Sequence, residues 1–350
     1  MPAVAVVGTG YWARNHVRVF KELLDEGEIE NLMLCDVSEE RVKALANGFD
    51  LKYTTDYDEI LNDKSFDSVS IVTSPQQHYD MAKKAIEQGK NVLIEKPMTM
   101  NSEEAGKLVN LTEKQGGLLM ACHIFRHHSA VQELKKRISR GDFGKIMYMF
   151  GNRLAFRIPR KDMGVLHSMG IHEMDLFCYL LGKEYPEGIY THMEGHFFEN
   201  IEETALIILT FDGNITCYAF ESWMAPVTGK KRELIVIGNK MSARIDYLKP
   251  QELQIFDSAI LPKKIEAGTT SDKVDGMTDF ELEQEGSYTI PIEYKEPLKE
   301  ELMHFISCVQ NHTQPISDMY SGKRAVEMIE VALKSAKSNS LIKLKDMNFK

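Results

Sequence analysis

The chain has 350 residues, of which 43% are hydrophobic and 27% charged, and this composition is typical of a soluble globular protein with room for two domains. The formal net charge of −10 argues against a general nucleic-acid partner, because phosphate backbones are bound by basic surfaces. No apolar run approaches the roughly 18–20 residues that cross a bilayer, and the start, MPAVAVVGTG, lacks the basic region of a signal peptide. We therefore expect neither a membrane nor a nucleic-acid function.

The cysteines indicate the redox environment. There are five, at wide spacing and without a CxxC pair, and most lie in apolar stretches such as LMLCD and LLMACH. An odd number of widely spaced cysteines in apolar surroundings favours reduced, buried thiols over a disulfide framework. We therefore expect a cytoplasmic protein.

The first third of the chain alternates short apolar strands with amphipathic helices. Strands are predicted over residues 3–8, 31–37, 67–74, 91–96 and 118–123, with helices over 11–27, 38–48, 76–89 and 102–117 between them. Strands separated by helices of this length form right-handed βαβ units and a parallel sheet. We predict a doubly wound α/β domain of the Rossmann type over residues 1–122.

After residue 123 the pattern changes to two helices and then successive strands. Helices are predicted over 129–141, 163–181, 297–312 and 321–338, and strand-like segments over 145–156, 188–198, 204–211, 214–224, 232–238, 241–248 and 251–257. Turn residues between the strands are typical of antiparallel hairpins. We predict an α+β domain over 123–350 with a large, open, mainly antiparallel sheet, and a loop over 261–288.

The stretch GTGYWA follows a predicted strand and begins a helix. Gly8 permits the tight turn, Gly10 lets the backbone approach a pyrophosphate, and Ala13 is small enough for close helix–strand packing. Asp36 ends the second strand, where a carboxylate binds ribose hydroxyls and repels a 2′-phosphate. The pattern predicts an NAD site, with NADP less favoured; the alternative is a glycine turn that binds no nucleotide.

Two further segments carry candidate catalytic groups. In LIEKPMTMN, Lys96 stands at the carboxyl end of a predicted parallel strand, where ligands bind, although a surface lysine before a turn is the alternative. In HSMGIHEMD, helical spacing of about 100° per residue places Ser168, His172 and Asp175 in one polar stripe and leaves His167 and Glu173 outside it. A buried core histidine is the alternative for His172.

Each of the remaining groups of polar residues allows a functional and a non-functional interpretation. Arg126, Arg153, Arg157 and Arg160 form a basic cluster that suits a substrate diphosphate, or they are solvated arginines on a loop. Cys122, His123, His127 and His128 are metal-ligand types, but a strand-to-helix junction scatters them. HMEGH resembles zincin spacing, yet its glutamate is misplaced and the segment reads as a strand. We predict no metal site.

The segments GTGYWARNH, VTSPQQHYDMAKKAIEQGKNVLIEKPMTMN and GVLHSMGIHEMDLFCYLLG, with Asp36, together resemble the Gfo/Idh/MocA family of NAD(P)-dependent oxidoreductases, and in detail its nucleotide-sugar branch. The resemblance runs over nearly the whole chain. It implies hydride transfer from a hydroxyl-bearing ring carbon of a sugar to nicotinamide, and generally a homodimer or homotetramer. The exposed face of the antiparallel sheet is a natural surface for such a contact.

The resemblance also implies roles for individual residues. The pyrophosphate would be held by Gly8, Thr9, Gly10, Tyr11 and Trp12, the adenosine ribose by Asp36, the nicotinamide side by Thr73, Pro75 and His78, and its ribose by Glu95. Lys96 would lie near the reacting hydroxyl, and the peptide before Pro97 is often cis in this family. His172 would be the base, while Ser168 stands where the family usually has an acid, so Asp175 or Lys96 would share the proton.

Four functions stay open at this point. The expected one is a nucleotide-sugar dehydrogenase in which the arginine cluster meets the diphosphate. A free-sugar, inositol or sugar-acid dehydrogenase differs only in what that cluster binds. An NAD-dependent glycosidase would oxidise its sugar transiently, and a non-enzymatic NAD sensor would transfer no hydride.

Overall fold

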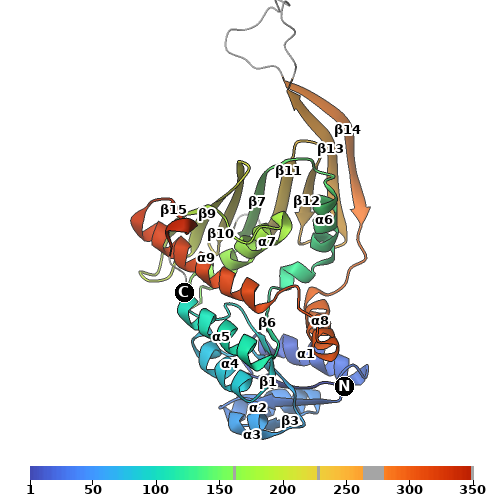
Figure 1. Cartoon of the computed structure of the whole chain (residues 1–350), viewed down its shortest axis with the longest axis vertical. Helices are drawn as coiled ribbons and strands as arrows, with labels where there is room; N and C mark the ends of the chain where they lie inside the picture. Colours follow the sequence, from blue (N-terminus) through green and yellow to red (C-terminus); the bar gives the residue numbers. More distant parts are fainter. Residues whose placement is uncertain (161–162, 227–228, 263–279, 348–350) are drawn as a thin grey trace, which may run out of the picture.

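The computed structural model describes residues 1–160, 163–226, 229–262 and 280–347, which form two sheets, one above the other, with helices around them (Figure 1). The first sheet has six parallel strands in the order β3-β2-β1-β4-β5-β6. Its strands are β1 (Ala3–Val7), β2 (Asn31–Cys35), β3 (Lys52–Thr54), β4 (Ser68–Ile71), β5 (Asn91–Ile94) and β6 (Leu119–Ala121). The predicted doubly wound sheet is confirmed, and its order reverses between β1 and β4, where ligands bind in such sheets.

Five helices connect these strands, and their ends carry the local signals that the sequence contains. They are α1 (Ala13–Asp25), α2 (Glu39–Phe49), α3 (Tyr57–Asn62), α4 (His78–Glu87) and α5 (Ser102–Gln115). The Ser38 side chain accepts from the Arg41 N–H at the start of α2, and Asn101 caps α5 in the same way. Gly116 ends α5 in the left-handed region at φ 71°.

The second sheet has nine strands and is mixed but mainly antiparallel, as predicted. The order is β14-β13-β12-β11-β7-β10-β9-β8-β15. The strands are β7 (Ile146–Leu154), β8 (Gly188–Glu194), β9 (Thr204–Phe211), β10 (Ile215–Ser222), β11 (Lys231–Gly238), β12 (Ser242–Asp246), β13 (Glu252–Pro262), β14 (Phe280–Pro291) and β15 (Ile342–Lys343). Although β7 comes first in the chain it lies at the centre, parallel to β10 and antiparallel to β11.

The predicted loop over residues 261–288 is wrong for its second part. Residues of β14 pair antiparallel with β13 from Phe280 to Pro291, and the hairpin projects beyond the rest of the sheet (Figure 1). The polar composition of β14 misled the prediction, because this strand is exposed from Leu282 to Gly286 and needs no apolar periodicity there. The middle of the predicted loop, 263–279, lies outside the described residues.

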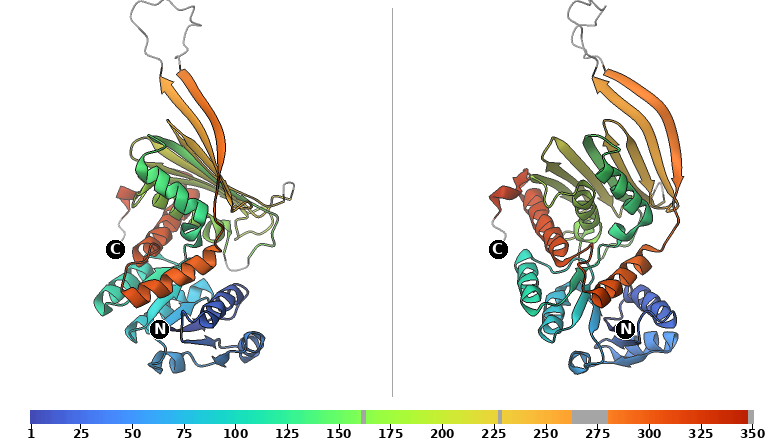
Figure 2. Two further views of the ribbon diagram at one scale, coloured as in Figure 1. Left: turned by 90° about the vertical axis from the view of Figure 1, so that its right-hand side faces the viewer. Right: turned by 45° about the vertical axis from the view of Figure 1, so that its right-hand side comes forward.

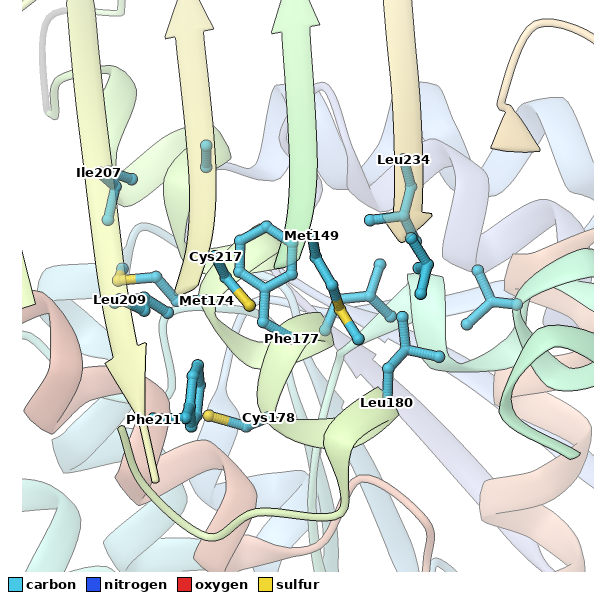
Figure 3. Close-up of a cluster of buried hydrophobic side chains, with 14 of the residues drawn as sticks. Met149, Met174, Phe177, Cys178, Leu180, Ile207, Leu209, Phe211, Cys217 and Leu234 are labelled. Carbon is cyan, nitrogen blue, oxygen red and sulfur yellow. The ribbon is translucent and has the colours of Figure 1, made fainter. Parts of the chain in front are cut away.

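Helices cover one face of the second sheet, as the left view of Figure 2 shows. They are α6 (Ser129–Arg140), α7 (Ile171–Leu181) and α9 (Met319–Ser338). Figure 3 shows the core between α7 and the strands, where Phe177 and Cys178 of α7 face Met149, Leu209 and Cys217. Strand β9 alternates half-buried and buried residues, as expected when one face is packed and the other is not.

The last two long helices join the two parts of the molecule. Helix α8 (Pro297–Asn311) packs on α1, and its Leu302 and Phe305 belong to the same buried cluster as Val17 and Phe20. Helix α9 contacts α5 and β6 as well as α7. The helices after residue 296 therefore complete the core of the first domain as well as that of the second.

The composition predicted reduced, buried cysteines and no membrane-spanning segment. The five cysteines are buried free thiols. None of the helices in the described ranges is long and apolar enough to cross a membrane.

Candidate functional site

The glycine turn after β1 has the geometry of a phosphate-binding loop. Gly8 has a φ of 95°, and a Cβ there would lie 2.7 Å from the Val72 carbonyl oxygen, so only glycine fits. A Cβ on Gly10 would meet nothing within 4 Å, which leaves its backbone open on the ligand side. The turn runs into the first turn of α1, whose N–H groups favour an anion. Tyr11 is almost fully exposed and Trp12 is half-exposed beside this turn.

Asp36 lies beside this turn at the end of β2. Its Oδ2 accepts from the Thr9 N–H at 2.7 Å and from the Thr9 hydroxyl at 2.8 Å, and its Oδ1 accepts from Arg41 at 2.8 Å. Burial opposes ionisation, but these bonds and one from the Ser38 N–H lower the pKa of Asp36 below its usual value. The carboxylate is therefore ionised and fixed where the adenosine ribose of a dinucleotide lies in this fold.

Replacing Asp36 by alanine should relax the preference for NAD over NADP. Juxtaposed like charges cost several kcal/mol, so the NADP/NAD ratio of kcat/KM should rise roughly tenfold or more when the carboxylate is removed. Arg41 then loses its partner and can meet a 2′-phosphate. Arg41→Met in the same background should cancel part of the gain. An unchanged ratio in Asp36→Ala would contradict the assignment.

Glu95, directly after β5, is held by groups from several elements. Its Oε1 accepts from Trp12 Nε1 at 2.6 Å and lies 3.0 Å from His16 Nε2, while its Oε2 accepts from the Lys96 N–H at 3.1 Å. His16 in turn lies 3.2 Å from the Ser70 hydroxyl. Burial opposes ionisation of Glu95, but His16 and Lys96 lower its pKa. This carboxylate therefore links the glycine turn to the end of β5.

Lys96 is directed from the first domain towards the second. The Lys96–Pro97 peptide is cis, and Nζ donates to the Ser168 carbonyl oxygen at 2.6 Å. Burial lowers the pKa of Lys96 to about 8; Glu95 opposes this shift, and Arg160, Arg153 and Arg157 add to it. A lysine with such a pKa is present in both protonation states near neutral pH and is suited to proton transfer.

The loops beside Lys96 are tied together by His78. Its Nδ1 lies 2.8 Å from the Pro97 carbonyl oxygen, and its Nε2 lies 3.3 Å from the Thr73 carbonyl oxygen. Burial lowers the pKa of this histidine, so the ring is neutral. The buried His78 ring thus lies between the Thr73 carbonyl oxygen and the cis peptide. Pro75 begins the 3-10 turn that precedes this histidine.

The helix that carries the second catalytic candidate begins with a π-helical turn. Residues Leu166–Gly170 are π-helical, and α7 follows from Ile171. His172 lies edge-on to Phe125 with ring centroids 5.0 Å apart. Burial, with the charges of Lys96 and Arg153, places the pKa of His172 well below its usual value, so its ring is neutral but a weak base. Ser168 contacts Lys96 through its carbonyl oxygen.

The polar stripe predicted for Ser168, His172 and Asp175 begins in the π-helical turn, and its last member is paired with another side chain. The Asp175 carboxylate is buried and accepts two bonds from Arg126, at 2.8 Å to Nε and 2.5 Å to the terminal nitrogen. His123 Nδ1 lies 3.5 Å from Asp175 Oδ2. Arg126 and Asp175, predicted as substrate ligands, are thus committed to each other.

Glu173, which helical spacing leaves outside the polar stripe, is the group that the sequence missed. It is fully buried, and its Oε2 accepts from Arg153 Nε at 2.6 Å. The Arg153 guanidinium lies over the Phe125 ring at 3.7 Å. An acid in an otherwise apolar helix was the available signal, because a buried carboxylate requires a partner.

The four predicted arginines therefore divide into two pairs. Arg126 and Arg153 are buried in ion pairs, whereas Arg157 and Arg160 are exposed beyond the end of β7. Both exposed arginines still lower the pKa of Lys96, so their charges act on the site. Of the four, Arg157 and Arg160 are thus the two that solvent reaches.

The donor groups of the CHIFRHH motif were predicted to be scattered over a strand-to-helix junction. Within the described ranges, one group has donor atoms that all lie within 4.8 Å of one another, namely His16, Glu95 and Cys122. Glu95 already accepts from Trp12, His16 and a backbone N–H. Burial lowers the pKa of His123 and His128 to about 4, and that of His127 to about 3. These rings are neutral parts of the packing between the domains.

Comparisons with known proteins cover both parts of the chain. The Gfo/Idh/MocA model described as "Oxidoreductase family, NAD-binding Rossmann fold" matches residues 3–123, and its companion, "Oxidoreductase family, C-terminal alpha/beta domain", matches residues 135–344. The scyllo-inositol 2-dehydrogenase (NAD(+)) of Bacillus subtilis (strain 168) is 28% identical over 279 residues, which are 76% of this chain and 74% of that protein. The UDP-N-acetylglucosamine 3-dehydrogenase of Acidithiobacillus ferrooxidans is 31% identical over 180 residues, 51% of this chain and 54% of that protein.

Solved structures share the architecture over the full length. A levoglucosan dehydrogenase in complex with NADH and levoglucosan superposes with a TM-score of 0.81 at 18% identity, covering 98% of this chain and 99% of that one. The structure of the A. ferrooxidans enzyme gives a TM-score of 0.78 at 23% identity, covering 96% and 97%. At these identities the structures support the fold, and the two family models together span most of the chain. The chain therefore belongs to the Gfo/Idh/MocA family of oxidoreductases, with an NAD-binding Rossmann domain followed by the family's α/β domain.

Proposed function

We propose that the protein is an NAD-dependent dehydrogenase that oxidises a ring hydroxyl of a sugar, with Lys96 and His172 handling the hydroxyl proton. The observation that carries the proposal is the position of Lys96. It is half-buried at the carboxyl end of β5, follows the Glu95 carboxylate that the glycine turn and α1 hold, and reaches the helix of His172 in the second domain. Relatives named for inositol, levoglucosan and nucleotide-sugar oxidation support the substrate class.

The residues present fit NAD, because the open backbone at Gly10 and the fixed carboxylate of Asp36 provide a place for its pyrophosphate and ribose. NAD, when bound, supplies the hydride acceptor. The substrate hydroxyl proton passes to the Lys96 amine, which at a pKa of about 8 is the stronger of the two bases. Neutral His172 orients the hydroxyl by accepting or donating one hydrogen bond. This division reverses the expected order of the two bases.

The pH dependence should follow Lys96. A general base acts when deprotonated, so kcat/KM for oxidation should rise with pH through about 8, where the buried amine loses its proton. If His172 were the base, the rise of kcat/KM would be complete at a pH well below the usual pKa of histidine, because the pKa of His172 is lowered. A kcat/KM that stays constant from about pH 6 to about pH 9 would contradict the assignment of the general base to Lys96.

A nucleotide sugar is the proposed substrate within this class. Arg157 and Arg160 are exposed after β7 and act electrostatically on Lys96, so an anionic group of the substrate would find positive charge beside the reacting carbon. A free polyol is the second candidate, which the inositol dehydrogenase relative favours. The two differ in whether binding depends on these arginines.

The test is NADH formation across a panel of UDP-sugars, free sugars, sugar acids and inositols, with calorimetric titration of UDP. Turnover of a UDP-sugar, UDP binding, and loss of both in Arg157→Ala/Arg160→Ala would support the nucleotide-sugar proposal. Turnover of scyllo-inositol or a free sugar without UDP binding would replace it with the second candidate. Release of a leaving group without net NADH would indicate a glycosidase, and NAD binding without any hydride transfer would indicate a sensor.

We also propose a homo-oligomer formed through the open face of the second sheet, in the cytoplasm that the free thiols favour. This face exposes large side chains on β7, β10 and β13, at Tyr148, Tyr218, Phe220 and Phe256. Light scattering coupled to size exclusion should give a multiple of the chain mass, and Tyr218→Glu/Phe220→Glu should reduce it to that of the monomer. Met303→Glu, on the solvent side of α8, is the matched control and should leave the mass unchanged. A monomeric wild-type protein would contradict the proposal.

A further inference from the structure

A row of charged residues crosses the second sheet beneath the candidate site. Glu221 of β10 pairs in register with Arg153 of β7, which pairs with Arg232 of β11. Directly paired residues project to the same face of a sheet, and this is the face that α7 covers. The neighbouring row on the same face, Ala219, Gly151 and Leu234, is uncharged. The apolar core under α7 is thus bounded by one charged row, which Glu221, Arg153 and Arg232 form across three adjacent strands.

The Glu173 side chain of α7 reaches this row of the sheet. Gly151 lies against it and has no side chain that would occupy the same space. A Cβ at position 151 would lie 2.7 Å from Glu173 Cγ, so any larger residue would displace this side chain. Glu173 Oε2 accepts from Arg153 Nε at 2.6 Å. The charged row therefore contains two carboxylates and two guanidiniums, in a place where burial makes every charge costly.

The two carboxylates have different surroundings. Glu173 accepts a charged hydrogen bond from Arg153. Glu221 is fully buried, and within the part of the chain that the structure describes neither of its oxygens has a hydrogen-bond partner. An ionised carboxylate without a donor is strongly disfavoured in the interior, whereas a protonated carboxyl is not. Burial raises the pKa of both carboxyls. Arg153 and its hydrogen bond oppose this shift at Glu173, whereas the adjacent Glu173 adds to it at Glu221, whose pKa lies well above its usual value despite Arg153 and Arg232.

We propose that Glu221 carries a proton in the working enzyme, so that Glu173, Glu221, Arg153 and Arg232 together bear one net positive charge beside Lys96 and His172. Glu221 is then a positioning residue that sets the proton affinity of both catalytic candidates without touching the substrate. The proposal rests on the proposed function only in assigning the proton transfer to Lys96.

The groups that face the two candidates make this charge effective. Lys96 faces Glu95, Arg153, Arg157 and Arg160, and the three arginines lower its pKa. His172 faces Lys96 from the first domain, Arg153 and Arg232 from the sheet, and His123 from the segment after β6. Ionisation of Glu221 would cancel the positive charge of the row, so both pKa values would rise.

The first experiment is infrared difference spectroscopy of the purified protein at neutral pH, which needs no substrate. Glu301 is a second buried acid whose pKa burial raises, so it should give a protonated-carboxyl band of its own. Glu221→Gln should therefore remove one such band, and this band should persist in Glu173→Gln and in the matched control Glu301→Gln. A spectrum that Glu221→Gln leaves unchanged would overturn the proposal, whatever the substrate.

The second experiment compares the pH profiles of two variants. Glutamine mimics a protonated carboxyl, so Glu221→Gln should keep the wild-type midpoint of kcat/KM against pH. Glu173→Gln removes the ionised group and leaves two net positive charges, so its midpoint should move to lower pH. Equal downward shifts in both variants would mean that Glu221 is ionised, and would overturn the proposal. Failure to find any turnover would affect only this second experiment.

Discussion

Replacement of Lys96 by methionine should abolish turnover while NAD still binds. Methionine keeps the length of the buried side chain but removes the amine that lies 2.6 Å from the Ser168 carbonyl oxygen. Loss of a positioned proton-transfer group costs roughly 10²–10⁴-fold in rate, and the rise of activity through about pH 8 should disappear with it. Steady-state rates over a pH series measure both effects.

Binding of NAD separates this result from misfolding. Calorimetric titration should give a dissociation constant for NAD close to that of the wild type, because the glycine turn and Asp36 are untouched. The thermal midpoint should not fall, since a buried amine is replaced by an apolar group. If Lys96→Met keeps most of its activity, the lysine serves only to join the two domains through Ser168.

The second large effect is expected on stability, at the ion pair between Arg126 and Asp175. Both side chains are buried, and two hydrogen bonds join them. Removal of one partner leaves an unpaired buried charge, so Arg126→Met should lower the free energy of unfolding by roughly 3–5 kcal/mol. Denaturant unfolding monitored by circular dichroism measures this loss.

The matched control removes both charges. Arg126→Met combined with Asp175→Leu should recover much of the stability, because no charge is then left unpaired. The wild-type contribution should also fade in acid: burial opposes ionisation of Asp175, but Arg126 and His123 lower its pKa. That stabilisation is complete above the unfolded pKa of about 3.9 and is lost as the pH falls through the lower folded value. Equal stability of the single and double variants would contradict the role of the pair.

Local features of the sequence were enough to predict the first sheet and the cofactor loop. The glycine turn, Asp36 and the lysine after β5 each depend on short-range geometry, because a strand, a tight turn and a helix follow one another within a few residues. The parallel order of the strands follows from their alternation with helices.

The partners of buried charges could not be predicted in this way. Arg126 and Arg153 were predicted to bind a substrate diphosphate, because nothing in the sequence shows that they form ion pairs with Asp175 and Glu173. The π-helical turn at Leu166–Gly170 was also not predicted, since the helical pattern was interpreted with one constant angle per residue. Strand β14 was missed because an exposed strand carries no apolar alternation. Each of these depends on contacts between segments far apart in the chain.

The placement of α8 has a consequence for the order in which the protein can mature. During synthesis the Rossmann strands emerge first, yet the buried cluster around Val17 and Phe20 of α1 is complete only when Leu302 and Phe305 of α8 have been made. A fragment ending after β6 would leave this apolar surface in water and should aggregate or remain loosely packed. Completion of the cofactor domain therefore waits for a segment that the ribosome makes only after the whole second sheet up to β14.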